Sequence, residues 1–235
     1  MRDRADAGTG SEHRIETVAG ARLLPGGGIV MSILSKRSTA EAAKPLVIIS
    51  GPSGAGKSTV VETLLSTCPL PIVRSTSVTT RPPRPGEIDG QDYHFVTPER
   101  FEDLRRGGAF LECKEVFGRG DWYGTLRETV ASGRQRGNWV LLEIDVEGAM
   151  AVLESEPDCL TIFLHPGSMA ELERRLRARR TETDEAIARR LAVAAREMGF
   201  RPRYQFEVIN HEVPQAAREI CELLQREERR RCSKS

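Results

Sequence analysis

The sequence lacks an excess of charge of either sign, because 35 lysine and arginine residues stand against 34 aspartate and glutamate residues. Such a balance gives no indication of a nucleic acid or an anionic membrane surface as partner. The sequence also lacks an apolar run approaching the roughly 20 residues that span a bilayer, and its N-terminal segment lacks the unbroken apolar stretch of a signal peptide. We therefore expect a soluble, cytoplasmic protein without an obligate protein partner, in which local clusters of cations hold any anionic ligand.

Cysteine is scarce and scattered. The five cysteines stand at positions 68, 113, 159, 221 and 232, and none belongs to a Cys-x-x-Cys pair. An odd number without paired spacing argues against a disulfide framework and against a zinc site. This usage predicts a reducing compartment, the cytosol.

The N-terminal segment shows neither helical nor strand periodicity. Residues 1–44 mix Gly, Ala, Ser, Arg and Asp, and they cannot bury enough apolar surface to offset the entropy of ordering. We expect a flexible tail. Met31 is a candidate for the true translational start, because the residues after it form an ordinary short leader to the first strand.

From Pro45 onward, apolar runs alternate with amphipathic helices. The runs typical of buried parallel strands occupy residues 46–50, 139–142, 160–164 and 206–209, with a further strand from 72 to 80. Helices with an apolar face or capping signals are expected at 58 to about 66, 168 to about 180, from about 184, and 214 to about 230. The alternation predicts an α/β fold with a parallel sheet flanked by helices.

A glycine-rich loop follows the first predicted strand. Residues 51–58 match Gly-x-x-x-x-Gly-Lys-Ser and precede a helix, as a phosphate-binding loop requires. Its glycines allow consecutive N–H groups to face an anion at the positive end of the helix, Lys57 can reach the β- and γ-phosphates, and Ser58 can ligate Mg²⁺. We therefore assign ATP to nine consecutive residues, namely Gly51, Pro52, Ser53, Gly54, Ala55, Gly56, Lys57, Ser58 and Thr59. The loop alone leaves GTPases, ATPases and kinases open.

Two arginines held by prolines come next. Arg81 and Arg84 stand three residues apart in Arg-Pro-Pro-Arg, and together they can present forked donors to one phosphate group. Tyr93 could add a neutral donor to the same phosphate. Taken alone, this stretch could equally be a solvated proline-rich loop.

Five motifs in order carry a resemblance to a known family. They read Gly-Pro-Ser-Gly-Ala-Gly-Lys-Ser-Thr at 51–59, Thr-Thr-Arg-Pro-Pro-Arg-Pro-Gly-Glu at 79–87, Phe-Leu-Glu-Cys at 110–113, Trp-Tyr-Gly-Thr at 122–125 and Glu-Ile-Asp-Val-Glu-Gly at 143–148. With them the chain resembles guanylate kinases, which phosphorylate GMP to GDP with ATP, over residues 45–224. The resemblance implies a P-loop NTPase-like α/β fold whose parallel sheet has five strands.

The resemblance also implies an internal division of the chain. A core at 45–80 and 138–224 would carry a small mixed α/β GMP-binding lobe at about 81–125 and a helical lid at about 177–190. Residues 225–235 would form a charged C-terminal end.

The same resemblance assigns the acceptor site. It implies that the GMP phosphate is held by Arg81, Arg84, Tyr93 and Tyr123, and that the guanine base is surrounded by Ser77, Glu112 and Thr125. Asp145 is assigned to the GMP site as well. The assignment of Glu112 makes chemical sense, because one carboxylate can accept from both N1–H and N2–H₂ of guanine. Adenine would present an acceptor there. A site built on such pairing rejects the wrong base by leaving buried polar groups unpaired.

The resemblance further nominates Arg179 and Arg190 as lid arginines that stabilise the transferring phosphoryl group. It places Asn210 near the adenine of ATP, although an asparagine at the end of a strand usually stabilises the turn that follows. Most other arginines in this stretch are expected to form a solvated basic helix face.

Three departures from the family pattern leave some roles open. Glu143 stands where an aspartate is usual, and either Glu143 or Asp145 could orient the Mg²⁺-bound water or brace the acceptor-site arginines, with Asp145 favoured. Residues 119–121 lengthen the segment before Tyr123 by two residues. His211 stands where an acidic residue is usual, beside the predicted adenine site.

The resulting expectation is an ATP:GMP phosphotransferase of purine nucleotide metabolism that acts on GMP and dGMP with Mg²⁺. A guanylate-kinase-like module that binds a phosphopeptide without catalysis is the alternative, but such modules typically lack a working phosphate loop. A kinase for another nucleoside monophosphate would need a different base pocket.

Overall fold

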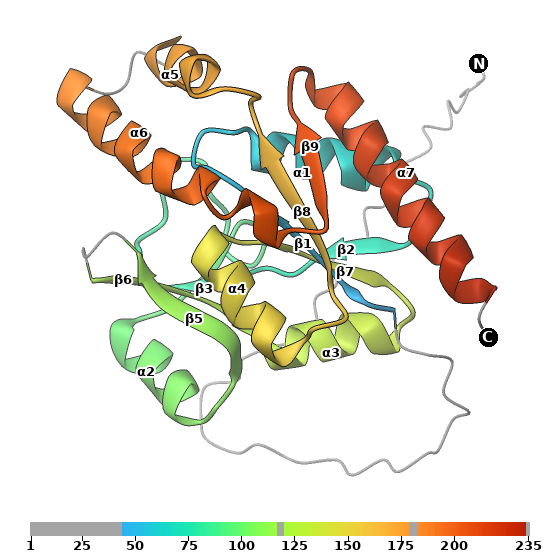
Figure 1. Cartoon of the computed structure of the whole chain (residues 1–235). Helices are drawn as coiled ribbons and strands as arrows, with labels where there is room; N and C mark the ends of the chain where they lie inside the picture. Colours follow the sequence, from blue (N-terminus) through green and yellow to red (C-terminus); the bar gives the residue numbers. More distant parts are fainter. Residues whose placement is uncertain (1–43, 117–119, 179–182, 234–235) are drawn as a thin grey trace, which may run out of the picture. The chain divides into compact units, whose positions relative to one another are not determined.

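The structure is a computed structural model that describes residues 44–116, 120–178 and 183–233 (Figure 1). Its larger sheet has five parallel strands in the order β2-β7-β1-β8-β9. These strands are β1 (Leu46–Ser50), β2 (Ile72–Arg74), β7 (Trp139–Glu143), β8 (Leu160–His165) and β9 (Phe206–Ile209). This is the α/β class and the five-stranded parallel sheet that the sequence predicted.

Helices cover both faces of this sheet (Figure 1). Alternate residues of β1 point to opposite faces, so Val47 and Ile49 pack against one pair of helices while Leu46 and Ile48 pack against another. The first pair is α1 (Lys57–Thr67) and α7 (Val213–Cys232), and the second is α3 (Arg127–Gln135) and α4 (Val146–Ser155). Burial on both sides explains why β1, β7 and β8 read as continuous apolar runs.

A second, four-stranded sheet has the order β4-β3-β6-β5 and mixes parallel and antiparallel pairs. Its strands are β3 (Val78–Thr79), β4 (His94–Phe95), β5 (Phe110–Val116) and β6 (Asp121–Leu126). Helix α2 (Pro98–Arg106) packs on it through Phe101, whose ring stacks on that of Phe110 with centroids 4.5 Å apart. We call this sheet with α2 the small lobe.

The remaining elements follow β8. They are α5 (Met169–Ala178), α6 (Asp184–Met198) and the short 3₁₀ helix η1 (Arg201–Arg203). The hydroxyl of Ser168 accepts the amide of Glu171 at the start of α5, as its capping signal predicts. The carboxylate of Glu171 binds Arg174 and Arg175 instead of completing a capping box.

The strand expected over residues 72–80 is wrong as a single element. Its first part is β2, which pairs with β7 of the large sheet and ends at Arg74, and its last part is β3, which pairs with β6 of the small lobe. One β-branched run therefore serves two sheets. Propensity alone does not reveal this division, because pairing partners decide where a strand ends.

The cysteine argument against disulfides is also wrong. Cys68, at the C-terminal end of α1, is bonded to Cys221 of α7, and their Cα atoms lie 5.7 Å apart. Helices α1 and α7 lie side by side on one face of the large sheet, so residues 153 positions apart meet. Sequence spacing carries no signal of such a long-range pair, and the prediction of a reducing compartment loses this support.

None of the helices in the described part of the chain is long and apolar enough to cross a membrane. The carboxyl ends of the five parallel strands share one edge of the large sheet, where ligands of open α/β sheets bind. The glycine-rich loop follows β1 at this edge, Asp145 follows β7, and Asn210 follows β9.

Candidate active site

The glycine-rich loop wraps the start of α1. Gly51 and Gly56 have φ values of 143° and 87°, which other residues rarely adopt. A Cβ on Gly51 would overlap the carbonyl oxygen of Leu164, and one on Gly56 would lie 2.6 Å from Nδ2 of Asn210. The loop therefore needs both glycines for its conformation and for its close packing. It places backbone N–H groups at the positive end of α1, which suits a phosphate.

Lys57 lies half-buried within this loop. Its Nζ donates hydrogen bonds to the carbonyl oxygens of Gly51 and Pro52, at 2.8 and 3.1 Å. Burial lowers the pKa of Lys57, and the nearby carboxylates of Glu143 and Glu197 oppose that shift. A phosphate at the loop would supply the lysine with a stronger counter-charge than two carbonyl groups.

Asn210 braces the loop from β9. Its side-chain Nδ2 donates to the carbonyl oxygen of Ala55 at 2.8 Å, and its main-chain carbonyl oxygen accepts from Nη2 of Arg175 at 2.6 Å. Asn210 is buried. Its side chain therefore has a structural task at the loop, whatever it contributes to adenine binding.

Helix α6 contacts the loop through the hydroxyl and the backbone amide of Ser53. The hydroxyl of Ser53 accepts from Nη2 of Arg190 at 2.8 Å, and the amide of Ser53 donates to Oε2 of Glu197 at 3.2 Å. Burial raises the pKa of Glu197. One predicted lid arginine thus lies at the phosphate loop, whereas the other, Arg179, lies outside the described residues.

The two carboxylates at the carboxyl end of β7, Glu143 and Asp145, have different partners. Glu143 accepts a 2.6 Å hydrogen bond from the hydroxyl of Ser58. Asp145 instead caps α4 by accepting the amides of Glu147 and Gly148, and it binds Lys114 at 2.8 Å. Glu143 therefore lies at the predicted metal-binding hydroxyl, while Asp145 lies where the core meets the small lobe.

The predicted phosphate-binding groups of the small lobe converge on Arg81. Its Nε donates to the hydroxyl of Tyr123 at 3.0 Å, and its guanidinium lies 5.4 Å from the ring centroid of Tyr93. Its Nη2 donates to Glu87 at 2.9 Å, and Glu87 also accepts the amide of Arg84 at 2.7 Å. The ion pair with Arg81 lowers the pKa of Glu87. The Arg-Pro-Pro-Arg stretch is thus built onto the lobe, with the side chain of Arg84 exposed beside it.

Glu112 and Thr125 face each other across β5 and β6. The hydroxyl of Thr125 donates to Oε1 of Glu112 at 2.7 Å, and the two residues are register partners. Burial raises the pKa of Glu112 to about 6, against the effect of the hydrogen bond from Thr125. Ser77 directly precedes β3 of the same sheet, and Thr59 lies exposed in the first turn of α1.

Three residues of this site carried no assigned role in the sequence. Glu87 stands three positions after Arg84, so charge complementarity to the arginines could have indicated it. Lys114 and Glu197 act on Asp145 and Ser53 from distant segments, at sequence separations of 31 and 144. Sequence gives no signal for contacts that only the packing of α4 and α6 creates.

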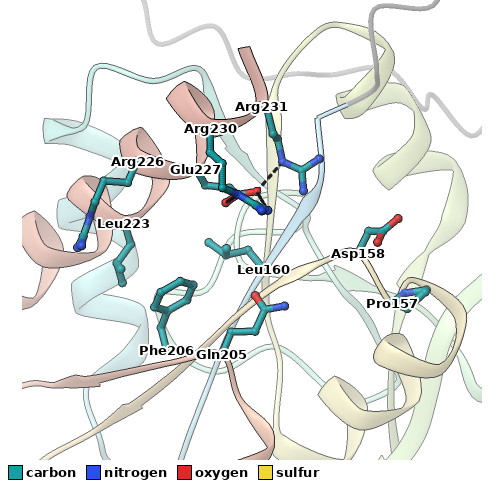
Figure 2. Close-up of a pocket in the computed structure, with 10 residues that line it drawn as sticks. All are labelled: Pro157, Asp158, Leu160, Gln205, Phe206, Leu223, Arg226, Glu227, Arg230 and Arg231. Carbon is teal, nitrogen blue, oxygen red and sulfur yellow. Dashed lines mark hydrogen bonds and ion pairs between the residues drawn. The ribbon is translucent and has the colours of Figure 1, made fainter. Parts of the chain in front are cut away.

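A cavity of about 480 Å³ lies elsewhere, against the amino ends of β8 and β9 and the last turns of α7 (Figure 2). Leu160, Phe206 and Leu223 line its apolar part, and Glu227 pairs there with Arg230 and Arg231. It contains none of the predicted site residues and lies at the edge opposite the phosphate loop. The candidate active site is therefore the carboxyl edge with the small lobe, not this cavity.

Comparison with known proteins shows the family of the chain. The guanylate kinase family model matches residues 43–227. A guanylate kinase of Rhodopirellula baltica is 57% identical over 191 residues, which cover 80% of this chain and 91% of that protein. One of Rubrobacter xylanophilus is 42% identical over 181 residues, covering 77% and 93%. The crystal structure of guanylate kinase from Anaplasma phagocytophilum is 34% identical, with a TM-score of 0.65 over 81% of this chain and 89% of that one. The chain belongs to the guanylate kinase family.

Proposed function

We propose that the phosphate loop holds ATP and the small lobe holds GMP or dGMP, so that this nucleoside monophosphate kinase transfers the γ-phosphate of ATP to the acceptor and releases ADP. The observation that carries the proposal is the pairing of a half-buried carboxylate, Glu112, with Thr125 in a lobe that also gathers Arg81, Tyr93 and Tyr123. These groups match a purine monophosphate, one end reading the base and the other the phosphate. The product GDP belongs to purine nucleotide metabolism.

The base end of the lobe favours guanine. An ionised Glu112 can accept from N1–H and N2–H₂ of guanine, and the hydroxyl of Thr125, which donates to Oε1 of Glu112, orients that carboxylate. Adenine at the same position would leave the carboxylate facing an acceptor, and a buried unpaired carboxylate is costly. We assign Ser77 and Asp145 to the same acceptor site, Asp145 through its place at the junction of α4 and β5.

The phosphate end of the lobe holds the nucleophile. Arg81 is oriented by Glu87 and Tyr123, so its guanidinium fork is set before the acceptor arrives. Arg84, Tyr93 and Tyr123 complete the donors. A phosphate monoester is a competent nucleophile near neutral pH, so the chain supplies positioning and charge and needs no protein base.

The donor side requires stabilisation of negative charge. Lys57 and the loop amides hold the β- and γ-phosphates of ATP, and Arg190, at Ser53, reaches the transferring group. Arg179 shares this role in the proposal. Asn210 fixes the loop beneath the nucleotide and lies on the adenine side.

The residues at the loop also fit Mg²⁺. Ser58 and Glu143 offer a hydroxyl and a carboxylate within 2.6 Å of each other, and Mg²⁺ prefers such hard oxygen ligands together with phosphates and waters. When bound, the ion would neutralise charge on the β- and γ-phosphates. The structure favours Glu143 over Asp145 for this task, because Asp145 is engaged by α4 and Lys114.

A coupled assay tests the assignment. Purified protein with ATP and Mg²⁺ is given GMP, dGMP, AMP, CMP or UMP, and we expect turnover with GMP and dGMP to exceed that with the others by orders of magnitude. Faster turnover of AMP than of GMP would contradict the role given to Glu112.

A further inference from the structure

Lys114 joins the small lobe to the core. It lies on β5, two residues after Glu112, and its ammonium donates to Oδ2 of Asp145 at 2.8 Å and to Oε2 of Glu147 at 2.7 Å. Both carboxylates belong to the start of α4. The side chain of Lys114 is 25% exposed, so the contact is partly shielded from solvent screening.

Glu112, the residue proposed to bind guanine, lies at the same junction. Residues 112 and 114 lie on one side of β5, because alternate residues of a strand share a face. Oε2 of Glu112 lies 3.2 Å from the position that a Cβ on Gly148 would take, so Glu112 packs against the first turn of α4. Oδ1 of Asp145 lies 3.5 Å from the same Cβ position, so the carboxylates of Glu112 and Asp145 are close together, and Lys114 binds Asp145 at this junction.

We propose that Lys114 is a positioning residue for guanine recognition, whose charge keeps Glu112 ionised when GMP binds. The proposal rests on the role of Glu112 proposed above. Lys114 should therefore affect the binding of GMP and leave the binding of ATP unchanged.

The charges around Glu112 support this role. Burial raises the pKa of Glu112 to about 6, and Asp145 of α4 raises it further. The hydrogen bond from Thr125 of β6 and the charge of Lys114 lower it. Loss of the ammonium removes one of the three effects that lower it, the third being a backbone hydrogen bond from Thr125. An opposite charge within about 4–6 Å of a carboxylate lowers its pKa by about 1 unit or more. The positive end of α4 remains in every variant.

The direction of the pH dependence follows. Ionised Glu112 accepts from both guanine donors, whereas protonated Glu112 brings a donor of its own. GMP affinity is therefore full above the pKa of Glu112 and is lost as the pH falls through it. Without Lys114 this loss begins at a higher pH.

Steady-state kinetics between pH 5.5 and 8.5 test the proposal, with KM for GMP and for ATP measured separately. Lys114→Met removes the charge at similar size, Lys114→Arg retains it, and Arg100→Met removes an exposed cation from α2 of the same lobe. We expect the KM for GMP of K114M to exceed that of the wild type about fivefold near pH 6 and to approach it near pH 8, as a shift of about one pKa unit requires. K114R and R100M should follow the wild type, and KM for ATP should stay constant. The GMP phosphate also titrates in this range, but equally for every variant.

Two results would overturn the proposal. One is a pH profile of KM for GMP that is the same in K114M and in the wild type. The other is a KM for GMP that K114M raises by the same factor at every pH, because such a rise shows only the loss of the ion pairs between the small lobe and the core. Glu112→Gln separates failure of the proposal from failure of the base assignment. A large, pH-independent rise in its KM for GMP supports the guanine role, and an unchanged KM overturns that role and the Lys114 proposal with it.

Discussion

The hydroxyl of Ser58 donates a 2.6 Å hydrogen bond to the carboxylate of Glu143, which joins the first turn of α1 to the end of β7. The contact exists because β1 and β7 are parallel neighbours, so that the segments after them meet at one edge of the sheet. It brings a hydroxyl and a carboxylate to the place where the phosphates of ATP are expected.

We predict that Glu143→Gln raises the Mg²⁺ concentration for half-maximal activity about tenfold, because it removes one anionic ligand from a hard cation. Glu143→Asp, with the residue usual at this position, should retain activity. Titration of activity with Mg²⁺ at saturating GMP measures this. The exposed Glu219 of α7 offers a matched control as E219Q, and a wild-type Mg²⁺ titration for E143Q would remove Glu143 from the metal site.

Lys57→Ala should lower kcat by about 10³-fold, because it removes a preorganised cation from the transferring phosphate in a half-buried site. GMP binding, measured by calorimetry, should persist, since the small lobe is intact. Near-normal turnover would contradict the role given to the loop.

Glu87→Gln should raise KM for GMP about tenfold and leave KM for ATP unchanged. Glu87 holds Nη2 of Arg81 with one oxygen and the amide of Arg84 with the other, and an amide side chain loses one acceptor and the charge. Glu102→Gln is the control, because Glu102 forms exposed ion pairs within α2, which contribute little. Equal KM values for GMP in the two variants would argue against an orienting role of Glu87.

Reduction of the Cys68–Cys221 bond should lower the unfolding temperature. The bond closes a loop of 153 residues, and the loss of such a constraint costs about 2–5 kcal/mol, or roughly 5–15 °C for a chain of this size. Differential scanning calorimetry with and without dithiothreitol measures the shift. Cys221→Ser should unfold at the lower temperature with and without dithiothreitol. Cys232→Ser changes an exposed free cysteine and should behave as the wild type. If dithiothreitol leaves the unfolding temperature of the wild type unchanged, the prediction is refuted.

Much of the large sheet could be predicted from the sequence. β1, β7 and β8 are buried on nearly their whole length, so their apolar runs are long enough to stand out. β9 lies at the edge of the sheet and is partly exposed. The helices between these strands carry an apolar face or capping residues. The small lobe was harder. β3 and β4 have two residues each, and so short a strand exists only through its partners.

The site shows the same division. The phosphate-binding roles of the loop at 51–58 and of the arginines at 81 and 84 could be predicted, because they depend on neighbours in sequence. In the loop, glycines precede the start of a helix, and between the arginines stand two prolines. The roles of Glu87, Lys114 and Glu197 could not be predicted in this way, because each depends on a partner that only folding brings close.

By itself, the sequence determined the fold class, the phosphate loop and the family, because periodicity, backbone freedom and motif order are local properties of the chain. Only the tertiary structure decided that Ser58 meets Glu143, that Asp145 is engaged by Lys114, and that Cys68 joins Cys221. The physical reason is that hydrogen bonds, ion pairs and disulfides act over a few ångströms in space, and the distance along the chain does not set that separation.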